Sequence, residues 1–80
     1  MADEFTPAKE RFTSLVGEID PDVKVVIPER STQDAFRISL TRGSNRRFMT
    51  VSEDDMLDLA EDEHAVAKMH AKLRQEIGAL

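Results

Sequence analysis

Four arginines and one phenylalanine in the middle of the chain have side chains suited to binding an anion and stacking on a base. They are Arg37, Arg42, Arg46, Arg47 and Phe48, and no acidic residue lies between Asp34 and Glu53. A guanidinium group binds a phosphate or a carboxylate through two parallel hydrogen bonds. An exposed aromatic ring is a platform on which an unpaired base can stack. These five residues are the candidate ligand or nucleic-acid face.

A second chemical pattern is the pair Glu61 and His64, whose spacing places a carboxylate and an imidazole on one face of a helix. In helix-bundle di-metal proteins, such a pair is completed by a second pair and by further glutamates. This chain has only one pair. The sequence therefore predicts no metal site and no cofactor.

Residues in a recognisable catalytic arrangement are missing from the sequence. It contains no cysteine, only three glycines and no glycine-rich phosphate loop. Its serines have no histidine in a sequence context typical of nucleophilic catalysis. The clustered carboxylates at residues 53–55 occupy an expected helix start, where no pocket would make one carboxyl group an acid and its neighbour a base. We therefore predict neither an enzyme nor a small-molecule substrate.

The alternation of residues 35–51 predicts a β-hairpin that positions the arginines. A two-residue turn at Gly43 and Ser44 fixes which residues face each other across the two strands. One face is then apolar and carries the pairs Phe36–Val51, Ile38–Met49 and Leu40–Arg47. The other face is polar and basic, with the pairs Arg37–Thr50, Ser39–Phe48 and Thr41–Arg46. Because Arg47 faces Leu40, its stem is expected along the rim of the core.

The segments before the hairpin predict a helix and a further strand. The helix begins with Thr6 as its N-cap and ends between Gly17 and Asp20, because Pro21 follows. Residues 1–5 are expected to be disordered. Residues 23–27 are rich in β-branched side chains and predict a strand. The polar link 28–34 is either a mobile connection or a small functional loop.

The segment after the hairpin predicts a long helix from Glu53 to about Ile77, with Ser52 as its N-cap. Its apolar stripe is interrupted at residues 61–64, where Asp62 can cap a second helix. Two alternatives follow. The helix is either continuous, with a length of about 37 Å, or it divides into a short helix to about residue 61 and a longer one after it.

These elements predict an α+β fold of one domain, residues 1–80, in the order α-β-β-β-α. The N-terminal helix and the continuous or kinked C-terminal helix would pack on one face of a three-stranded antiparallel sheet, leaving the face of Arg37 and Phe48 open. Double-stranded RNA-binding domains have the same order of elements, but their last helix begins with lysines that meet phosphates. Here that position holds Glu53, Asp54 and Asp55, so only the topology is shared and no family is indicated.

The end of the last helix is a second candidate surface. Written in heptads, it places Leu73 and Leu80 at one seam position and His70 and Ile77 at the other. If the helix projects beyond a small core, Leu73, Ile77 and Leu80 form a dimer or partner face. Charging His70 at such an interface would weaken the dimer below about pH 6.5. The alternative is that the same stripe packs on the protein's own sheet.

Composition limits the class of function. The 80 residues include 16 acidic and 11 basic ones, a net charge of −5, which disfavours nonspecific binding to nucleic acid or to anionic lipid. The absence of cysteine and of any apolar run near the roughly 18 residues that span a membrane leads us to expect a cytoplasmic protein with no membrane partner. The sequence favours a small non-catalytic interaction module that binds a protein partner or itself. The alternative is nucleic-acid binding through the basic face of the hairpin.

Overall fold

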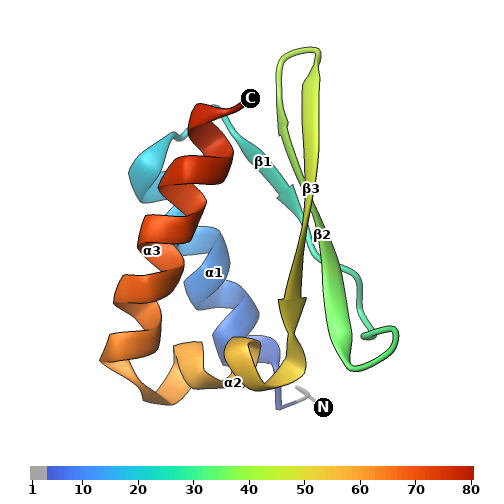
Figure 1. Cartoon of the computed structure of the whole chain (residues 1–80), viewed down its shortest axis with the longest axis vertical. Coiled ribbons are helices and arrows are strands. Elements are labelled where there is room, and N and C mark those ends of the chain that lie inside the picture. The colour runs from blue at the N-terminus through green and yellow to red at the C-terminus, as the bar shows by residue number, and fades with distance from the viewer. Residues whose placement is uncertain (1–3) are drawn as a thin grey trace.

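The computed structural model describes residues 4–80 and confirms the predicted α+β fold, with the last helical segment divided in two. The elements are α1 (Thr6–Ile19), β1 (Lys24–Val26), β2 (Ala35–Arg42), β3 (Asn45–Ser52), α2 (Glu53–Glu61) and α3 (Glu63–Gly78). The helices lie on one side of the sheet, and no described helix covers the other side (Figure 1). The molecule therefore has a helical layer, a sheet layer and one open sheet face.

The sheet is antiparallel in the order β1-β2-β3, so β2 is the central strand. The pairing of β2 with β3 runs without a slip from Arg42 and Asn45 at the turn to Ala35 and Ser52 at the other end. Gly43 has a positive φ of 61° at the first of the two turn positions, which is the conformation that a type II′ hairpin turn requires. The predicted hairpin and its register are confirmed.

Helix α1 begins differently from the prediction. Its N-cap is Phe5, which makes no side-chain cap, and Thr6 is already helical, so the prediction of Thr6 as N-cap was wrong. Phe5, which we expected to be disordered, packs edge to face on Phe36 with ring centroids 5.0 Å apart. This aromatic contact holds the chain at the start of the helix. Residues 1–3, also expected to be disordered, lie outside the described residues. The helix ends at Ile19, as predicted.

The connection between β1 and β2 contains a tight turn. Gln33 and Asp34 both have positive φ, 54° and 62°, and the backbones of Thr32 and Ala35 on either side exchange hydrogen bonds of 2.8 and 3.2 Å. Two consecutive positive φ values are typical of a type I′ turn, which glycine or asparagine adopts more easily than glutamine. The carbonyl of Asp34 also accepts a hydrogen bond from the backbone N–H of Glu53, so the link is anchored to the start of α2.

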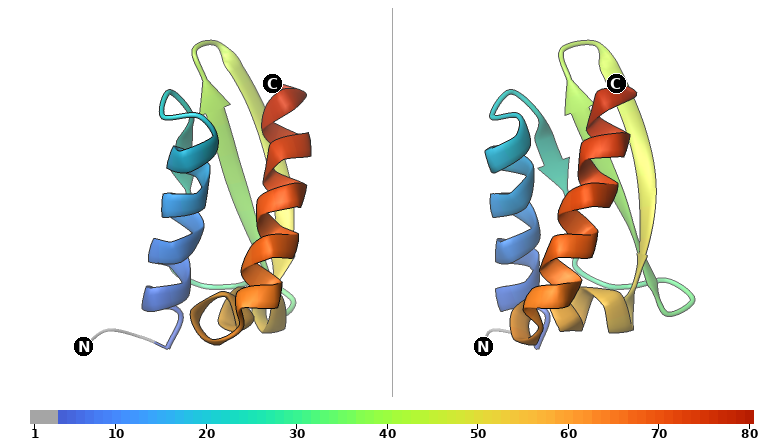
Figure 2. Two further views of the ribbon diagram at one scale, coloured as in Figure 1. Left: turned by 90° about the vertical axis from the view of Figure 1, so that its left-hand side faces the viewer. Right: turned by 60° about the vertical axis from the view of Figure 1, so that its left-hand side comes forward.

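The break between α2 and α3 lies at Asp62. Its carboxylate accepts a hydrogen bond of 2.8 Å from the backbone N–H of His64 and so caps α3. The break turns α3 back across the sheet beside α1 (Figure 2). A continuous helix of about 37 Å would exceed the longest dimension of the molecule, 33 Å. Of the two alternatives, the division at residues 61–64 is confirmed and the continuous helix was wrong.

The core fills the space between the sheet and the helices. Its largest fully buried side chains come from α1, the hairpin, α2 and α3, and they are Phe12, Val16, Phe36, Ile38, Leu40, Val51, Met56, Leu59 and Leu73. Strand β1 is shorter than the predicted 23–27, and it contributes less: Val23 just before it is buried, whereas Val25 is half-buried. Because every buried side chain of the sheet points to the helices, the open face is left to polar, charged and a few apolar residues.

Candidate binding face

The sheet side chains that point away from the helices form one continuous surface, which we call the outer face. Its residues are Lys24, Val26, Arg37, Ser39, Thr41, Arg46, Phe48 and Thr50. The alternation of each strand places them there, since their neighbours in sequence point into the core. The outer face contains three cations and no acidic residue. It is thus a basic surface on a protein whose net charge is −5.

Two exposed apolar side chains lie in one row of the outer face. Val26 pairs with Ser39, and Ser39 pairs with Phe48, so the three residues form a line across the sheet. Val26 is 63% exposed and Phe48 48% exposed, and within residues 4–80 they are the large hydrophobic side chains that remain exposed. Strand spacing puts Val26 and Phe48 about 10 Å apart. The small Ser39 lies between them, so the row presents two large apolar side chains separated by a small polar one.

The cations lie on both sides of this apolar row. Lys24 and Arg46 flank Thr41 in the next row towards the hairpin turn. Arg37 lies in the row on the other side, and its guanidinium carbon is 4.6 Å from the centroid of the Phe48 ring. This cation–π contact holds the ring against the outer face. The result is an exposed row with two apolar side chains and positive charge on both sides of it.

Arg42 and Arg47 do not belong to the outer face, although we had grouped them with it. Arg42 donates to Oδ2 of Asp20 at 2.8 Å and to the carbonyl of Leu80 at 3.0 Å, which joins the hairpin tip to the ends of α1 and α3. The Nε of Arg47 donates to Glu76 of α3. Both arginines share strand alternation with Leu40, so they point to the helical side. The structure therefore separates these two arginines from Arg37, Arg46 and Phe48, and a binding role for them stays a prediction.

The hydrogen bond from Arg42 lowers the pKa of the Asp20 carboxyl group, and the backbone N–H of Asp22, which donates to the same side chain at 2.9 Å, adds to the effect. Each donor stabilises the ionised carboxylate. Arg42 is therefore a structural side chain that fastens three segments together, and its charge is partly neutralised by Asp20.

Lys24 and Val26 were missed as members of the binding face. The sequence places them on the side of their strand opposite Val23. It does not show which edge of the hairpin this strand joins. The pairing of Val26 with Ser39 supplies that information: Lys24 lies in the row of Arg46 and Val26 in the row of Phe48.

The predicted partner face at the C-terminus is part of the core. Leu73 is fully buried, Ile77 is 3% exposed, and Leu80 is half-buried against the core. The prediction of a projecting helix was wrong because the break at Asp62 folds α3 onto the sheet. These three residues contribute to the stability of the chain itself, and they offer no exposed apolar surface for a second copy.

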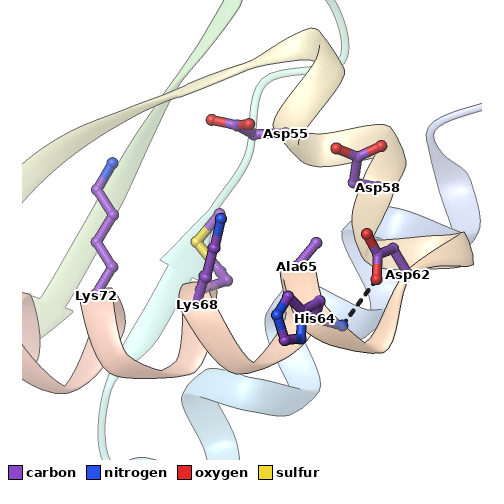
Figure 3. A pocket seen from close by; sticks show the side chains of 8 residues that line it. Asp55, Asp58, Asp62, His64, Ala65, Lys68 and Lys72 are labelled. Atoms are coloured by element: carbon purple, nitrogen blue, oxygen red, sulfur yellow. Dashed lines mark hydrogen bonds between the residues drawn. The ribbon is translucent and has the colours of Figure 1, made fainter.

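A hollow of about 210 Å³ lies between α2 and α3. In Figure 3, Asp55 and Asp58 stand on one side of it and Lys68 and Lys72 on the other. All four side chains are exposed, and none forms an ion pair with another described residue. Solvated charges of this kind bind a ligand weakly. The hollow is therefore a feature of the surface and not a built site.

Glu61 and His64 gain no further ligand from the fold. Within the part of the chain that the structure describes, no three histidine, aspartate or glutamate side chains come close enough to hold a metal ion. In the same residues, no helix combines the length and the apolar character needed to cross a membrane.

The fold and the outer face define a small α+β domain with one open, basic sheet face. Comparisons with protein-family models, with curated proteins and with solved structures give no significant match for this chain. We therefore base the proposal of a function on the chemistry of the outer face.

Proposed function

We propose that this chain is a non-catalytic interaction module whose outer face binds a protein partner that presents an apolar side chain among carboxylates. The observation that carries the proposal is the row of Val26, Ser39 and Phe48, which leaves two large apolar side chains exposed between cations. Exposed apolar side chains rimmed by charged residues are typical of interaction surfaces, and this row has that pattern. The cytoplasmic location expected from the composition remains part of this proposal.

The side-chain types on the outer face are those that dominate protein interfaces. Aromatic and arginine residues supply most of the binding energy in such interfaces, with the apolar anchor in a central pocket and the charges around it. Phe48 and Arg37 are already in contact, so little conformational freedom is lost on binding. The cations select a partner with acidic residues, because like charges across an interface are costly.

The test compares what the immobilised chain captures from its own cell extract with what two variants capture. The face-reversed variant carries Arg37→Glu and Arg46→Glu. Its matched control carries Arg11→Glu and Arg74→Glu, two exposed helix residues, and has the same change of net charge. We expect a protein that is held by the wild type and by the control but lost by the face-reversed variant. Equal capture by all three chains would contradict the proposal.

Nucleic-acid binding by the outer face is a second candidate function. The observation that favours it is the Arg37 guanidinium stacked on Phe48, a platform to which a base can add, with Lys24 and Arg46 within reach of phosphates. With three cations, the slope of log affinity against log salt should be about −2 for a single strand. Fluorescence anisotropy of labelled single-stranded and duplex oligonucleotides at two salt concentrations measures it. No binding at low salt excludes this function.

A further inference from the structure

We propose that a second copy of this chain can occupy the outer face by docking its helix α2 there. The inference rests on the proposed function, because it requires the outer face to be a docking surface, and it adds the identity of one partner. It depends on a complementary pattern of side chains in α2 of the same chain.

Helix α2 presents one apolar side chain among carboxylates. Its core side is formed by Met56 and Leu59, which are buried. Leu57 lies away from that side and is half-buried. At 100° per residue, Glu53 and Glu61 stand one turn before and one turn after Leu57 on the same strip of the helix. Exposed residues beside this strip include Asp54 and Asp58 on one side and Ala60 on the other.

The spacing of this pattern matches the spacing of the outer face. Successive rows of outward side chains along a strand are about 6.6 Å apart, and residues four apart along a helix are about 6 Å apart. With α2 parallel to the strands and Leu57 over Ser39, Glu61 reaches one cationic row. Glu53, which is half-buried and accepts a hydrogen bond from Ser31 of its own chain, lies towards the other. The apolar side chain then lies between Val26 and Phe48 while the exposed carboxylates meet the cations.

Charge complementarity selects this pairing over the packing of two outer faces against each other. Two outer faces would oppose Lys24, Arg37 and Arg46 to the same three cations of the other copy, with no acid between them. Between Asp54 and Lys68, by contrast, the chain carries no basic residue apart from His64. The acidic α2, whose exposed carboxylates include Asp54, Asp58 and Glu61, and the basic outer face attract each other.

The contact is small and its ion pairs are exposed, so the association is weak. Interfaces of this size and wetness bind with dissociation constants of roughly 10 µM to 1 mM. Salt screens exposed charge pairs beyond a Debye length of about 10 Å at 0.1 M. We expect sedimentation equilibrium at low salt to show an average mass that rises with concentration over that range and falls again when salt is added.

A charge swap tests the pairing. The face-reversed variant (Arg37→Glu, Arg46→Glu) has an acidic outer face and an acidic α2. The helix-reversed variant carries Asp58→Lys and Glu61→Lys, exposed positions near the end of α2 where a cation is favourable to the helix dipole. It keeps the basic outer face and makes the C-terminal end of α2 basic, while Glu53, Asp54 and Asp55 at the start of the helix are unchanged. Each variant alone should remain monomeric, and an equimolar mixture of the two should regain the association of the wild type.

The outcomes are separable. A wild type that stays monomeric up to about 1 mM, or a helix-reversed variant that associates as the wild type does, overturns the docking of α2. The proposed function is read independently, because the helix-reversed variant keeps its outer face. If that variant still captures the protein that the face-reversed variant loses, the outer face binds another partner even where self-association has failed. Thermal unfolding of each variant checks that it is folded.

Discussion

Replacing Asp62 by alanine tests the turn on which the helical layer depends. Asp62 is the single residue between α2 and α3, and its carboxylate accepts a hydrogen bond of 2.8 Å from the backbone N–H of His64. Alanine at this position removes the acceptor and leaves that N–H to water. It also replaces a residue that favours helix starts by one that favours helix interiors.

The expected loss is the value of one helix cap. Replacing an aspartate N-cap by alanine costs about 1 kcal/mol of the free energy of unfolding, within a range of about 0.5 to 2 kcal/mol. A domain of this size has a total of roughly 4 to 12 kcal/mol. In small domains, each kilocalorie lowers the midpoint of thermal unfolding by about 4 to 8 °C. Asp62→Ala should therefore melt several degrees lower while staying folded at 25 °C.

The variant should keep the break in spite of its greater helix propensity. A continuous helix would remove Met69, Leu73 and Ile77 from the core, and all three are buried. Each buried side chain of this kind contributes about 1.5 to 3 kcal/mol. Their sum is several times larger than what one alanine adds to a continuous helix. Packing, and not the cap alone, therefore keeps α3 against the sheet.

Thermal and urea unfolding followed by circular dichroism measure the effect, with Glu61→Ala as the matched control. Glu61 is exposed and neighbours Asp62 but is not a cap, so its replacement should change stability by less than about 0.5 kcal/mol. Equal unfolding midpoints for the two variants would refute the capping role. A rise in helical signal together with a larger hydrodynamic radius in Asp62→Ala would refute the packing argument.

Three further predictions concern the core, the turn and the acid response. Leu73→Ala should lower the free energy of unfolding, measured in urea, by about 2 to 5 kcal/mol, while the control Lys72→Ala should change it by less than about 0.5 kcal/mol. If Leu73 belonged to a partner face instead of the core, Leu73→Ala would leave the free energy of unfolding unchanged. Gln33→Gly should raise the thermal midpoint, because the positive φ of glutamine costs about 1 to 2 kcal/mol and glycine gives back only about 0.5 to 1 kcal/mol in chain entropy; an unchanged or lower midpoint would contradict this. Because the pKa of Asp20 lies below its usual 3.8, its ionised form stabilises the fold above that pH, and this stabilisation is lost as the pH falls through the lowered pKa. Asp20→Asn should have a lower free energy of unfolding than the wild type at neutral pH, and its free energy of unfolding should change less with pH below about pH 4. Parallel pH profiles of unfolding for the two chains would refute the Arg42 contact.

Local signals in the sequence were enough for the register of the hairpin, and they marked the position at which the last helix could break. A two-residue turn at Gly43 fixes the pairing of every later residue in the hairpin, and Asp62 interrupts an apolar stripe at a position suited to a cap. Local signals did not show what covers the apolar stripe of α3. Leu73 and Ile77 recur with the period of a buried helix face, and that period is the same whether the cover is the protein's own sheet or a second copy.

The two classes of arginine in the hairpin follow from one geometric rule. Strand alternation sends Arg42 and Arg47 to the helical side, where Asp20 and Glu76 bind them, and it leaves Arg37 and Arg46 on the outer face. A slip of β3 by one residue would exchange the faces of Arg46 and Arg47 and turn Met49 and Val51 to the outer face. The turn at Gly43 therefore determines both the stability of the fold and the charge of the outer face, so variants of the turn cannot separate the two. Substitutions of Arg37, Arg46 and Phe48 can, because these side chains contact no core residue across the sheet, and a loss of binding in them reports on the outer face alone.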